Sequence, residues 1–330
     1  MKILDNKRKL DKLIRKSKNI FIISHKNLDL DAIGSSIGMF NILEKKHKNC
    51  YLILEDKKHE AGVEKILNEL EGCLNIIKTN KIKDKLYDNP KNNLLIILDT
   101  NKKSLLQSEE AVKYFDNIVI IDHHEYGKES LKNGLIIIDN NASSTCEMIA
   151  TYMENKRIVL TPYYATLVLA GIVLDTNNFT LKTTKNTYYS AYYLACLGAS
   201  PKKVQYLLKQ DLKDYIQRQK LFANIEVLPD KIAFAKGTSE VIYRREDLAK
   251  VADTLLFFNN TEASFVIGKL KEDTVGISAR SMGNFDINKV LSKLGGGGTQ
   301  YNGAAQLDNA TIYEAEKLLK KELKKLEGED

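Results

Sequence analysis

The first 200 residues alternate between short, uninterrupted apolar runs and longer segments with helical periodicity. Apolar runs of this length suit strands that are buried on both faces, whereas apolar positions three and four apart suit helices packed on a sheet. The runs predict strands at residues 19–24, 50–54, 94–98 and 118–121. The periodic segments predict helices at residues 31–45, 143–154, 162–174, 187–197 and 201–208. Such alternation is typical of a parallel sheet with helices on either side.

The chain changes character after Pro229, where short strand-like segments replace the long helices. A helical stretch over residues 212–225 is expected to connect the two parts. Beyond it the pattern predicts strands at 231–235, 263–270 and 274–280, and helices at 286–294 and 309–326. Because 330 residues exceed one ordinary hydrophobic core, we expect two domains, residues 1–200 and 229–330, with residues 201–228 as a helical linker.

Composition narrows the class of protein. The formal net charge of +7 comes almost entirely from lysine, so we interpret it as a compositional bias and expect no duplex nucleic acid as a partner. No apolar run reaches the roughly 20 residues that cross a bilayer, so no membrane contact is expected within this chain. The four cysteines are scattered and form no C-x-x-C pair, which predicts reduced thiols and a cytoplasmic location.

Acidic residues and histidines gather where predicted strands and helices end. These residues are His25, Asp29, Asp31, Asp99, Asp122, His123, His124 and Asp175. Asp29 or Asp31 alone could simply cap the following helix, but capping does not explain His25. Asp175 ends an apolar helix, where a carboxylate opposes the helix dipole and indicates a neighbouring cation.

The types of side chain in this set predict the metal. Carboxylates and imidazoles without cysteine favour Mn²⁺, with Fe²⁺ or Co²⁺ as alternatives. So many acids can share one site only if cations neutralise them. Two ions roughly 4 Å apart would satisfy the number of ligands, activate a water molecule and bind a phosphoryl group.

Several longer segments carry a resemblance to a known family. They are HKNLDLDAIGSSIGM at 25–39, ASSTCEM at 142–148, LAGIVLDTNNFTLKT at 169–183, ADTLL at 252–256, EASFVIG at 262–268, VGISARSMG at 275–283 and GGGG at 295–298. Over residues 17–325 the chain resembles the DHH phosphoesterases, and in particular their bacterial cyclic-di-AMP phosphodiesterase branch. The resemblance implies an α/β fold: a parallel-sheet DHH domain with flanking helices, a helical linker and a smaller α/β DHH-associated domain, with the active site in the interdomain cleft.

The resemblance also implies a role for each candidate ligand. One metal ion would be held by His25, Asp29 and Asp99. The second would be held by Asp31, Asp99, His123 and Asp175, so that Asp99 bridges the two ions. His124 would contact the scissile phosphate or support the ligands, and Asp122 would orient its neighbours. Asp99, His123 and His124 are therefore the catalytic candidates.

The second domain is expected to bind the substrate. In the segment from Ser278, Arg280 would bind a phosphate through two hydrogen bonds, with a surface ion pair as the alternative. Gly296, Gly297 and Gly298 would bring backbone N–H groups to the nucleotide, with a flexible loop as the alternative.

Three further residues bear on substrate binding. Thr299 stands where the family usually has histidine, which affects a substrate contact and leaves the metal site intact. Ser143 and Ser144 would line the substrate cleft or, equally well, cap a helix.

The resulting hypothesis is a manganese-dependent, two-metal phosphodiesterase that opens cyclic di-AMP to linear pApA and can continue to AMP. A nanoRNase or 3′-phosphoadenosine phosphatase that acts on short linear substrates is the alternative, and a non-catalytic nucleotide sensor is a third. Membrane-anchored relatives carry transmembrane and sensory regions before this part. The chain is therefore expected to be either the catalytic part of such a parent, at the cytosolic face of the membrane, or a short version of it. A homodimer is left open.

Overall fold

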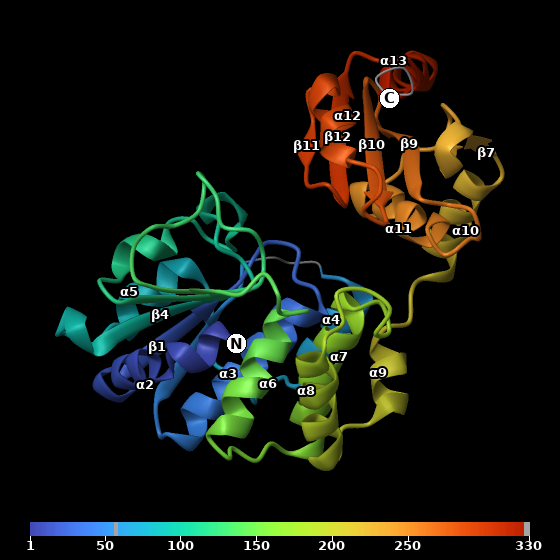
Figure 1. The fold of residues 1–330 in the computed structure, drawn as a ribbon. Helices are drawn as coiled ribbons and strands as arrows, with labels where there is room; N and C mark the ends of the chain where they lie inside the picture. Colours follow the sequence, from blue (N-terminus) through green and yellow to red (C-terminus); the bar gives the residue numbers. More distant parts are fainter. Residues whose placement is uncertain (56–58, 327–330) are drawn as a thin grey trace. The chain divides into compact units, whose positions relative to one another are not determined.

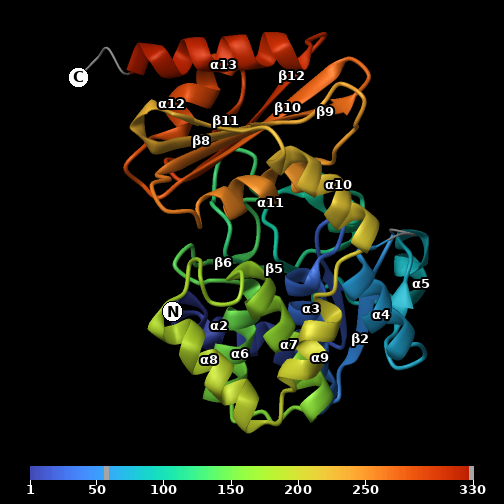
Figure 2. The same ribbon diagram turned by 90° about the vertical axis from the view of Figure 1, so that its right-hand side faces the viewer.

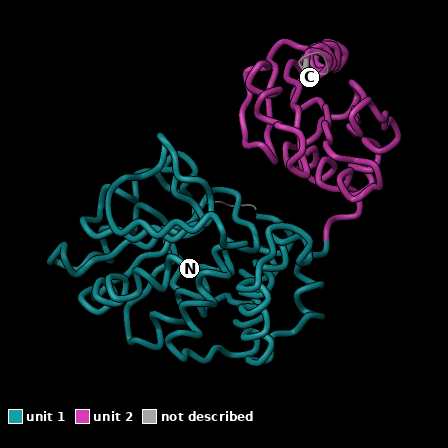
Figure 3. Tube along the Cα trace, viewed as in Figure 1, with its two compact units in different colours: residues 1–209 teal, residues 210–330 magenta. Residues whose placement is uncertain are grey.

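A computed structural model describes residues 1–55 and 59–326, and the chain forms two compact units, residues 1–209 and 210–330 (Figures 1 and 3). The expected linker is divided between the units, since α9 (Pro201–Leu207) belongs to the first and α10 (Leu212–Phe222) to the second. The helix predicted for 212–225 is too long. The chain leaves the helical conformation after Phe222 and pairs as β7 (Ile225–Leu228) with β8 (Ile232–Lys236).

The first unit contains a six-stranded sheet in the order β3-β2-β1-β4-β5-β6, and every strand pair in it is parallel. Its strands are β1 (Asn19–Ile23), β2 (Asn49–Ile53), β3 (Ile76–Ile77), β4 (Asn93–Leu98), β5 (Ile118–Asp122) and β6 (Leu135–Ile138). The predicted parallel sheet is confirmed. Because β1, β4 and β5 are neighbours, the residues that follow their carboxyl ends meet at one edge of the sheet.

Apolar residues of the central strands pack against both faces of this sheet. Ile20 and Ile22 belong to one core, while Phe21 and Ile23 belong to the core on the opposite face. The larger core contains residues of most of the helices, which Figure 2 shows beside the sheet. The helices of this unit are α1 (Lys2–Asp5), α2 (Lys7–Lys16), α3 (Leu30–Lys45), α4 (Ala61–Glu69), α5 (Ile82–Lys85), α6 (Thr145–Asn155), α7 (Pro162–Asp175), α8 (Lys185–Cys196) and α9.

Helices α3 and α7 approach each other closely through two glycines. A Cβ atom on Gly34 would lie 2.7 Å from the carbonyl oxygen of Leu167. A Cβ atom on Gly171 would lie 2.8 Å from the Cα atom of Asp31 and 2.5 Å from Sγ of Cys146. The absence of these side chains allows α3, α6 and α7 to bring their functional ends together.

The second unit contains a mixed six-stranded sheet in the order β11-β12-β10-β9-β8-β7, in which only β8 and β9 are parallel. Its other strands are β9 (Ala263–Lys271), β10 (Thr274–Ser281), β11 (Gly297–Gly298) and β12 (Asn302–Asp308). Helices α10 and α11 (Arg245–Leu255) pack on one face, and α12 (Ile287–Leu291) and α13 (Ile312–Leu326) pack on the other. The expected smaller α/β domain is confirmed, although the helix predicted at 286–294 becomes a 3-10 turn after Leu291.

None of the helices in the described ranges combines the length and apolar character that crossing a membrane requires.

Replacing Gly171 with alanine is expected to destabilise the first unit. The new methyl group would press on the α3 backbone at Asp31, and such overpacking costs about 1–3 kcal/mol. This cost outweighs the gain of about 1 kcal/mol in helix propensity. Urea unfolding should therefore show a lower free energy of unfolding for Gly171→Ala. Gly127→Ala is the matched control, because nothing lies within 4 Å of its Cβ position, and an equal loss in both variants would contradict the packing argument.

Candidate metal centre

The structure brings the predicted metal ligands together at the carboxyl edge of the parallel sheet. Their potential ligand atoms form groups in which all atoms lie within 4.8 Å of one another. The groups are His25–Asp29–Asp99, Asp31–His123–Asp175 and Asp99–His123–His124. The first group equals the set predicted for one metal ion, and the second contains three of the four residues predicted for the other. The assignment of individual ligands stays a prediction.

Asp99 lies between the groups and reaches both of them. Its Oδ2 atom is 3.3 Å from Nε2 of His25, and its Oδ1 atom is 3.5 Å from Nε2 of His123. The residue follows β4 with a φ of 60°, a left-handed conformation that an aspartate adopts more readily than most residues. This backbone turn at the strand end directs one buried carboxylate toward two imidazoles.

The amino end of α6 binds the carboxylate of Asp31. The backbone N–H of Thr145 donates to Oδ2 and that of Cys146 donates to Oδ1, each at 2.8 Å. The Thr145 hydroxyl also donates to Oδ1 of Asp99 at 3.0 Å. A helix amino terminus stabilises negative charge, so α6 holds two of the acids in place. Sequence reasoning missed these contacts, because backbone donors leave no trace in residue type.

Asp29 caps α3 through one carboxylate oxygen and faces His25 with the other. Its Oδ1 atom accepts from the N–H groups of Asp31 and Ala32, each at 2.9 Å, and so caps α3. Its Oδ2 atom lies 3.8 Å from Nε2 of His25. Nδ1 of His25 lies 2.7 Å from the carbonyl oxygen of Lys26. That carbonyl fixes the tautomer and leaves Nε2 facing the acids.

The acids in this cluster have strongly altered pKa values. Burial, together with the charges of Asp99 and Asp175, raises the pKa of Asp29 to about 7 and that of Asp31 well above its usual range. Burial also raises the pKa of Asp99, but the imidazoles of His123 and His25 outweigh it and hold that pKa below its usual range. Burial lowers the pKa values of His25 and His123, but the neighbouring acids outweigh it and raise the pKa of His25 to about 10 and that of His123 well above its usual range. These two imidazoles therefore carry positive charge that offsets the carboxylates.

The surroundings of His123 fit a bound divalent cation. Its side chain is 3% exposed, and Nε2 lies 3.2 Å from Oδ2 of Asp175 and 3.5 Å from Oδ1 of Asp99. Within the described residues, however, neither ring nitrogen has a partner in hydrogen-bond geometry. An imidazole surrounded by carboxylate oxygens that it does not bond directly is the arrangement that a shared cation would satisfy.

Asp122 orients His124, while His123 depends on other residues. Oδ1 of Asp122 lies 2.8 Å from Nδ1 of His124, and Oδ2 accepts from Nδ2 of Asn101 at 2.7 Å. The His124 side chain is 56% exposed, so the atoms beyond Nδ1 are accessible to a ligand. Asn101 is a supporting residue that sequence reasoning missed, although it follows Asp99 by two positions.

Ser143 and Ser144 are both fully buried. The Ser144 hydroxyl accepts from the N–H of Glu147 at 3.0 Å and caps α6, and the Ser143 hydroxyl donates to Glu147 at 2.5 Å. The capping interpretation therefore describes Ser144. The expected lining of a substrate cleft does not agree with this burial, because neither side chain reaches a surface.

Arg280 in the second unit forms the ion pair that was its alternative interpretation. Its Nε donates to Asp253 at 2.6 Å, and Nη1 donates to Ser278 Oγ at 3.3 Å and to the carbonyl oxygen of Ala279 at 2.9 Å. Nη2 takes part in none of these bonds. Asp253 comes from the ADTLL segment, so that segment and the SAR segment are in direct contact. An arginine held in this way is preorganised to bind an anion.

The glycine run forms part of a β-hairpin. Gly297 and Gly298 pair with Ala304 and Gly303 as β11 and β12, so the run is not an unpaired loop. A Cβ atom on Gly296 would lie 2.3 Å from the carbonyl oxygen of Ala304, which explains the glycine there. The Thr299 hydroxyl accepts from the N–H groups of Tyr301 and Asn302 at 3.2 and 3.3 Å. Thr299 thereby stabilises the turn of the hairpin.

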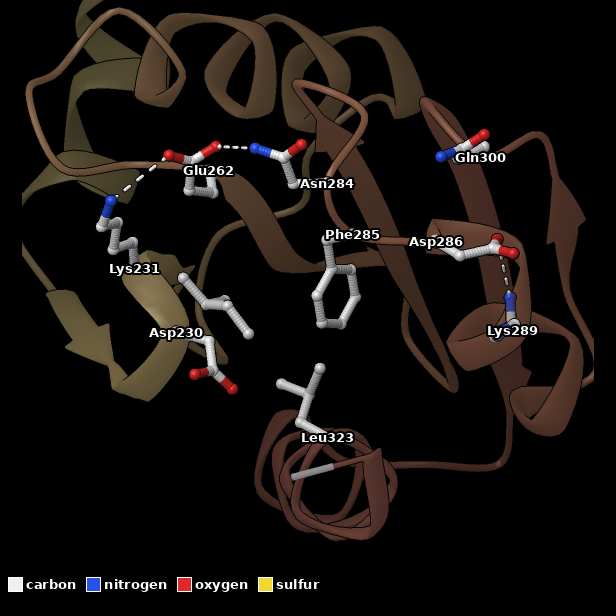
Figure 4. A pocket seen from close by; sticks show the side chains of 10 residues that line it. Asp230, Lys231, Glu262, Asn284, Phe285, Asp286, Lys289, Gln300 and Leu323 are labelled. Carbon is white, nitrogen blue, oxygen red and sulfur yellow. Dashed lines mark hydrogen bonds and ion pairs between the residues drawn. The ribbon is translucent and has the colours of Figure 1, made fainter. Parts of the chain in front are cut away.

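The second unit contains a cavity of about 780 Å³ (Figure 4). Phe285 and Leu323 line it and pack with the core beneath α12 and α13, whereas Arg280 alternates with the core residue Ala279 along β10. This cavity is therefore separate from the residues predicted to bind substrate.

Family comparisons agree with this architecture. The N-terminal domain model of the DHH family matches residues 19–172, and the DHHA1 domain model matches residues 231–327. Together the two matches cover most of the chain, which belongs to the DHH family.

Among curated relatives, the cyclic-di-AMP phosphodiesterase PdeA of Listeria monocytogenes is 37% identical over 94% of this chain and 48% of its own length. The cyclic-di-AMP phosphodiesterase GdpP of Bacillus subtilis is 32% identical over the same shares. The chain thus spans about half the length of these relatives. The bifunctional oligoribonuclease and PAP phosphatase NrnA of Thermus thermophilus is 24% identical over 84% of this chain and 81% of its own length.

Solved structures share the fold. An exopolyphosphatase-related protein from Bacteroides fragilis has a TM-score of 0.77 at 20% identity, with 96% of this chain and 95% of that chain covered. RecJ from Thermus thermophilus, solved in complex with Mn²⁺, has a TM-score of 0.54 at 12% identity, with coverage of 98% and 55%.

Replacing Asp175 with asparagine is expected to preserve or raise the melting temperature of the metal-free protein and to weaken metal binding. Removing one of several neighbouring carboxylates relieves repulsion, so the metal-free variant should melt at or above the temperature of the metal-free wild type. Adding MnCl₂ should raise the melting temperature of the wild type and have a smaller effect on the variant.

Asp116→Asn is a control on an acid outside the cluster, and it should respond to MnCl₂ as the wild type does. Equal metal-induced shifts in the wild type and Asp175→Asn would exclude Asp175 as a ligand.

Proposed function

We propose that this chain is a metal-dependent phosphodiesterase that hydrolyses cyclic di-AMP to linear pApA. The observation that carries the proposal is the buried cluster of acids and histidines at the sheet edge, in a chain 37% identical to a named cyclic-di-AMP phosphodiesterase. Mn²⁺ is the proposed metal, with Fe²⁺ or Co²⁺ as alternatives, because the cluster offers carboxylate oxygens and imidazoles. The cytoplasm is the proposed place of reaction, in agreement with the four free cysteines.

Two divalent cations bound in the cluster would supply an activated water molecule and neutralise phosphoryl oxygens. Asp99 is proposed to contact both cation positions, since its two oxygens face His25 and His123. The amino end of α6 keeps the Asp31 carboxylate oriented while charge changes around it. His124, held at Nδ1 by Asp122, is proposed to present Nε2 to a phosphate oxygen. Arg280 is proposed to bind a substrate phosphate through Nη2.

A phosphodiesterase for short linear substrates is the second candidate. It is favoured by Thr299, which replaces the histidine usual in the family, and by the more distant similarity to NrnA. Comparing kcat/KM on cyclic di-AMP, pApA and 3′-phosphoadenosine 5′-phosphate separates the two candidates. The first predicts the highest value for the cyclic dinucleotide, and the second predicts a higher value for a linear substrate.

Asp99→Asn should abolish turnover while leaving the fold intact. An amide carries no charge and cannot join two cations, so kcat with Mn²⁺ should fall at least about 100-fold. Losing a residue that only supports a metal ligand costs at most about that much. Asp116→Asn is the control variant, and circular dichroism checks the fold of both. Turnover of cyclic di-AMP by Asp99→Asn at the wild-type rate would show that the proposed bridging role is wrong.

Restoring the family histidine at position 299 tests the substrate contact. Thr299→His should lower KM for cyclic di-AMP and leave kcat near that of the wild type, because the residue is expected to contact substrate and no metal ligand. The turn needs a check, since the Thr299 hydroxyl accepts two backbone hydrogen bonds there. Thr299→Ser keeps the hydroxyl and serves as the control. An unchanged KM in Thr299→His, with the fold preserved, would exclude a contact from this position.

A further inference from the structure

One face of the second sheet carries an exposed strip along β12. Asn302, Ala304 and Gln306 alternate on this strand and are all exposed, whereas Ala305 between them is buried against the core. Helix α11 packs on the same side as these residues but over β9 and β10. A strand with small and polar residues on an exposed face offers a flat surface that a ligand can cover.

The middle of this strip is flat because three neighbouring strands contribute small residues there. Gly297 on β11 pairs with Ala304 on β12, which pairs with Ser278 on β10, so the three residues lie side by side on one face. Nothing lies within 4 Å of a Cβ position on Gly297. Arg280 donates from Nη1 to the hydroxyl of Ser278, the residue that pairs with Ala304.

Gln306 lies at one end of the strip, and its carboxamide is held in one orientation. Arg245, the first residue of α11, donates to Oε1, and Nε2 donates to Oδ1 of Asp308 at 2.9 Å. A flipped amide would set donor against donor and acceptor against acceptor, so the arginine and the aspartate together exclude it. Among the contacts of the described residues, one acceptor position on Oε1 and one N–H on Nε2 are left for a ligand.

These remaining positions match adenine. A glutamine amide can accept from the N6 amino group of adenine and donate to N7, whereas guanine presents two acceptors, O6 and N7, at the same edge. The oxygen of a fixed amide would therefore meet a donor on adenine and an acceptor on guanine. Gln306 lies two strand positions from Ala304, or about 7 Å along β12. That spacing is comparable with the distance from a phosphate to its base within one nucleotide.

We propose that Gln306, oriented by Arg245 and Asp308, reads the adenine of a nucleotide whose phosphate is bound by Arg280, with Ala304 and Gly297 as the flat floor beneath it. This proposal deepens the proposed function and rests on it for the identity of the substrate. Gln306 contacts the base and determines specificity, whereas Arg245 and Asp308 are positioning residues.

The test compares the wild type with Gln306→Met, which keeps the length of the side chain and removes the amide. Calorimetry on the full chain measures binding of 5′-AMP and 5′-GMP, and kinetics measure KM and kcat for cyclic di-AMP. The wild type should bind 5′-AMP more tightly than 5′-GMP. The variant should lose roughly 10-fold in affinity for 5′-AMP, the size of one bidentate base contact, and change little for 5′-GMP. KM for cyclic di-AMP should rise by a similar factor, with kcat within about twofold.

Gln217→Met is the matched control, because that half-buried glutamine on α10 bonds only the carbonyl oxygen of Ile242 among the contacts described. It should leave both nucleotide affinities unchanged. Arg245→Met should weaken the preference for adenine partially, because the amide is then free to flip. Ala304→Leu, at an exposed strand position, should weaken binding of both nucleotides by covering the floor.

The outcomes separate this inference from the proposed function. An unchanged adenine preference in Gln306→Met, or no preference in the wild type, overturns the inference. If Ala304→Leu binds both nucleotides as tightly as the wild type, the surface at Ala304 does not contact the ligand, and that part of the inference is wrong. If the wild type fails to hydrolyse cyclic di-AMP while the adenine preference depends on Gln306, the base-reading site stands and the proposed substrate is wrong.

Discussion

Repulsion among buried carboxylates is the constraint on which the first unit depends. Asp29, Asp31, Asp99 and Asp175 converge within a small volume, and burial together with the neighbouring charges raises the pKa values of Asp29 and Asp31. Folding alone gives no reason to gather like charges away from water, because each charge loses hydration and repels the next. The arrangement becomes favourable once cations lie among the acids, so the fold is best understood as a scaffold that keeps an anionic site open.

Several features of the fold serve to hold these acids apart from water and in fixed directions. The strand order brings the ends of β1, β4 and β5 to one edge, and Gly34 and Gly171 let α3 and α7 pack closely enough to add their own acids. The amino end of α6 compensates part of the charge on Asp31. Each device acts on backbone geometry, so the predicted ligands lie at the ends of strands and helices or within a few residues of them.

Much of this could be predicted from the sequence because the signals are local. The apolar runs before His25, Asp99 and Asp122 predict buried parallel strands, and parallel strands place their ends together. The features that could not be predicted depend on the direction in which side chains and backbone N–H groups point. Whether Ser144 faces a cleft or caps a helix depends on how α6 is rotated, and the backbone donors of α6 carry no signature in residue type.

The second unit was harder to predict for a related reason. Strand β12 reads NGAAQLD, and its exposed face leaves only a weak alternation of apolar residues. The helix expected over 212–225 ends early because pairing of β7 with β8 outweighs the local helical pattern. Gln306 can be considered as a binding residue only when the register of β12 against β10 is known, because that register sets which side chains share a face with Arg280.

The two units therefore solve different physical problems. The first holds acids and histidines together at one edge of a parallel sheet, and burial on both faces of that sheet supplies rigidity. The second unit is proposed to bind a flat, polar ligand, and an exposed strand with small residues suits this because little must be displaced when such a ligand binds. With the proposed roles, reactivity and base specificity can vary independently. A change at position 299 or 306 would alter binding and leave the acids at the sheet edge untouched, so the departure at Thr299 is compatible with the proposed metal site.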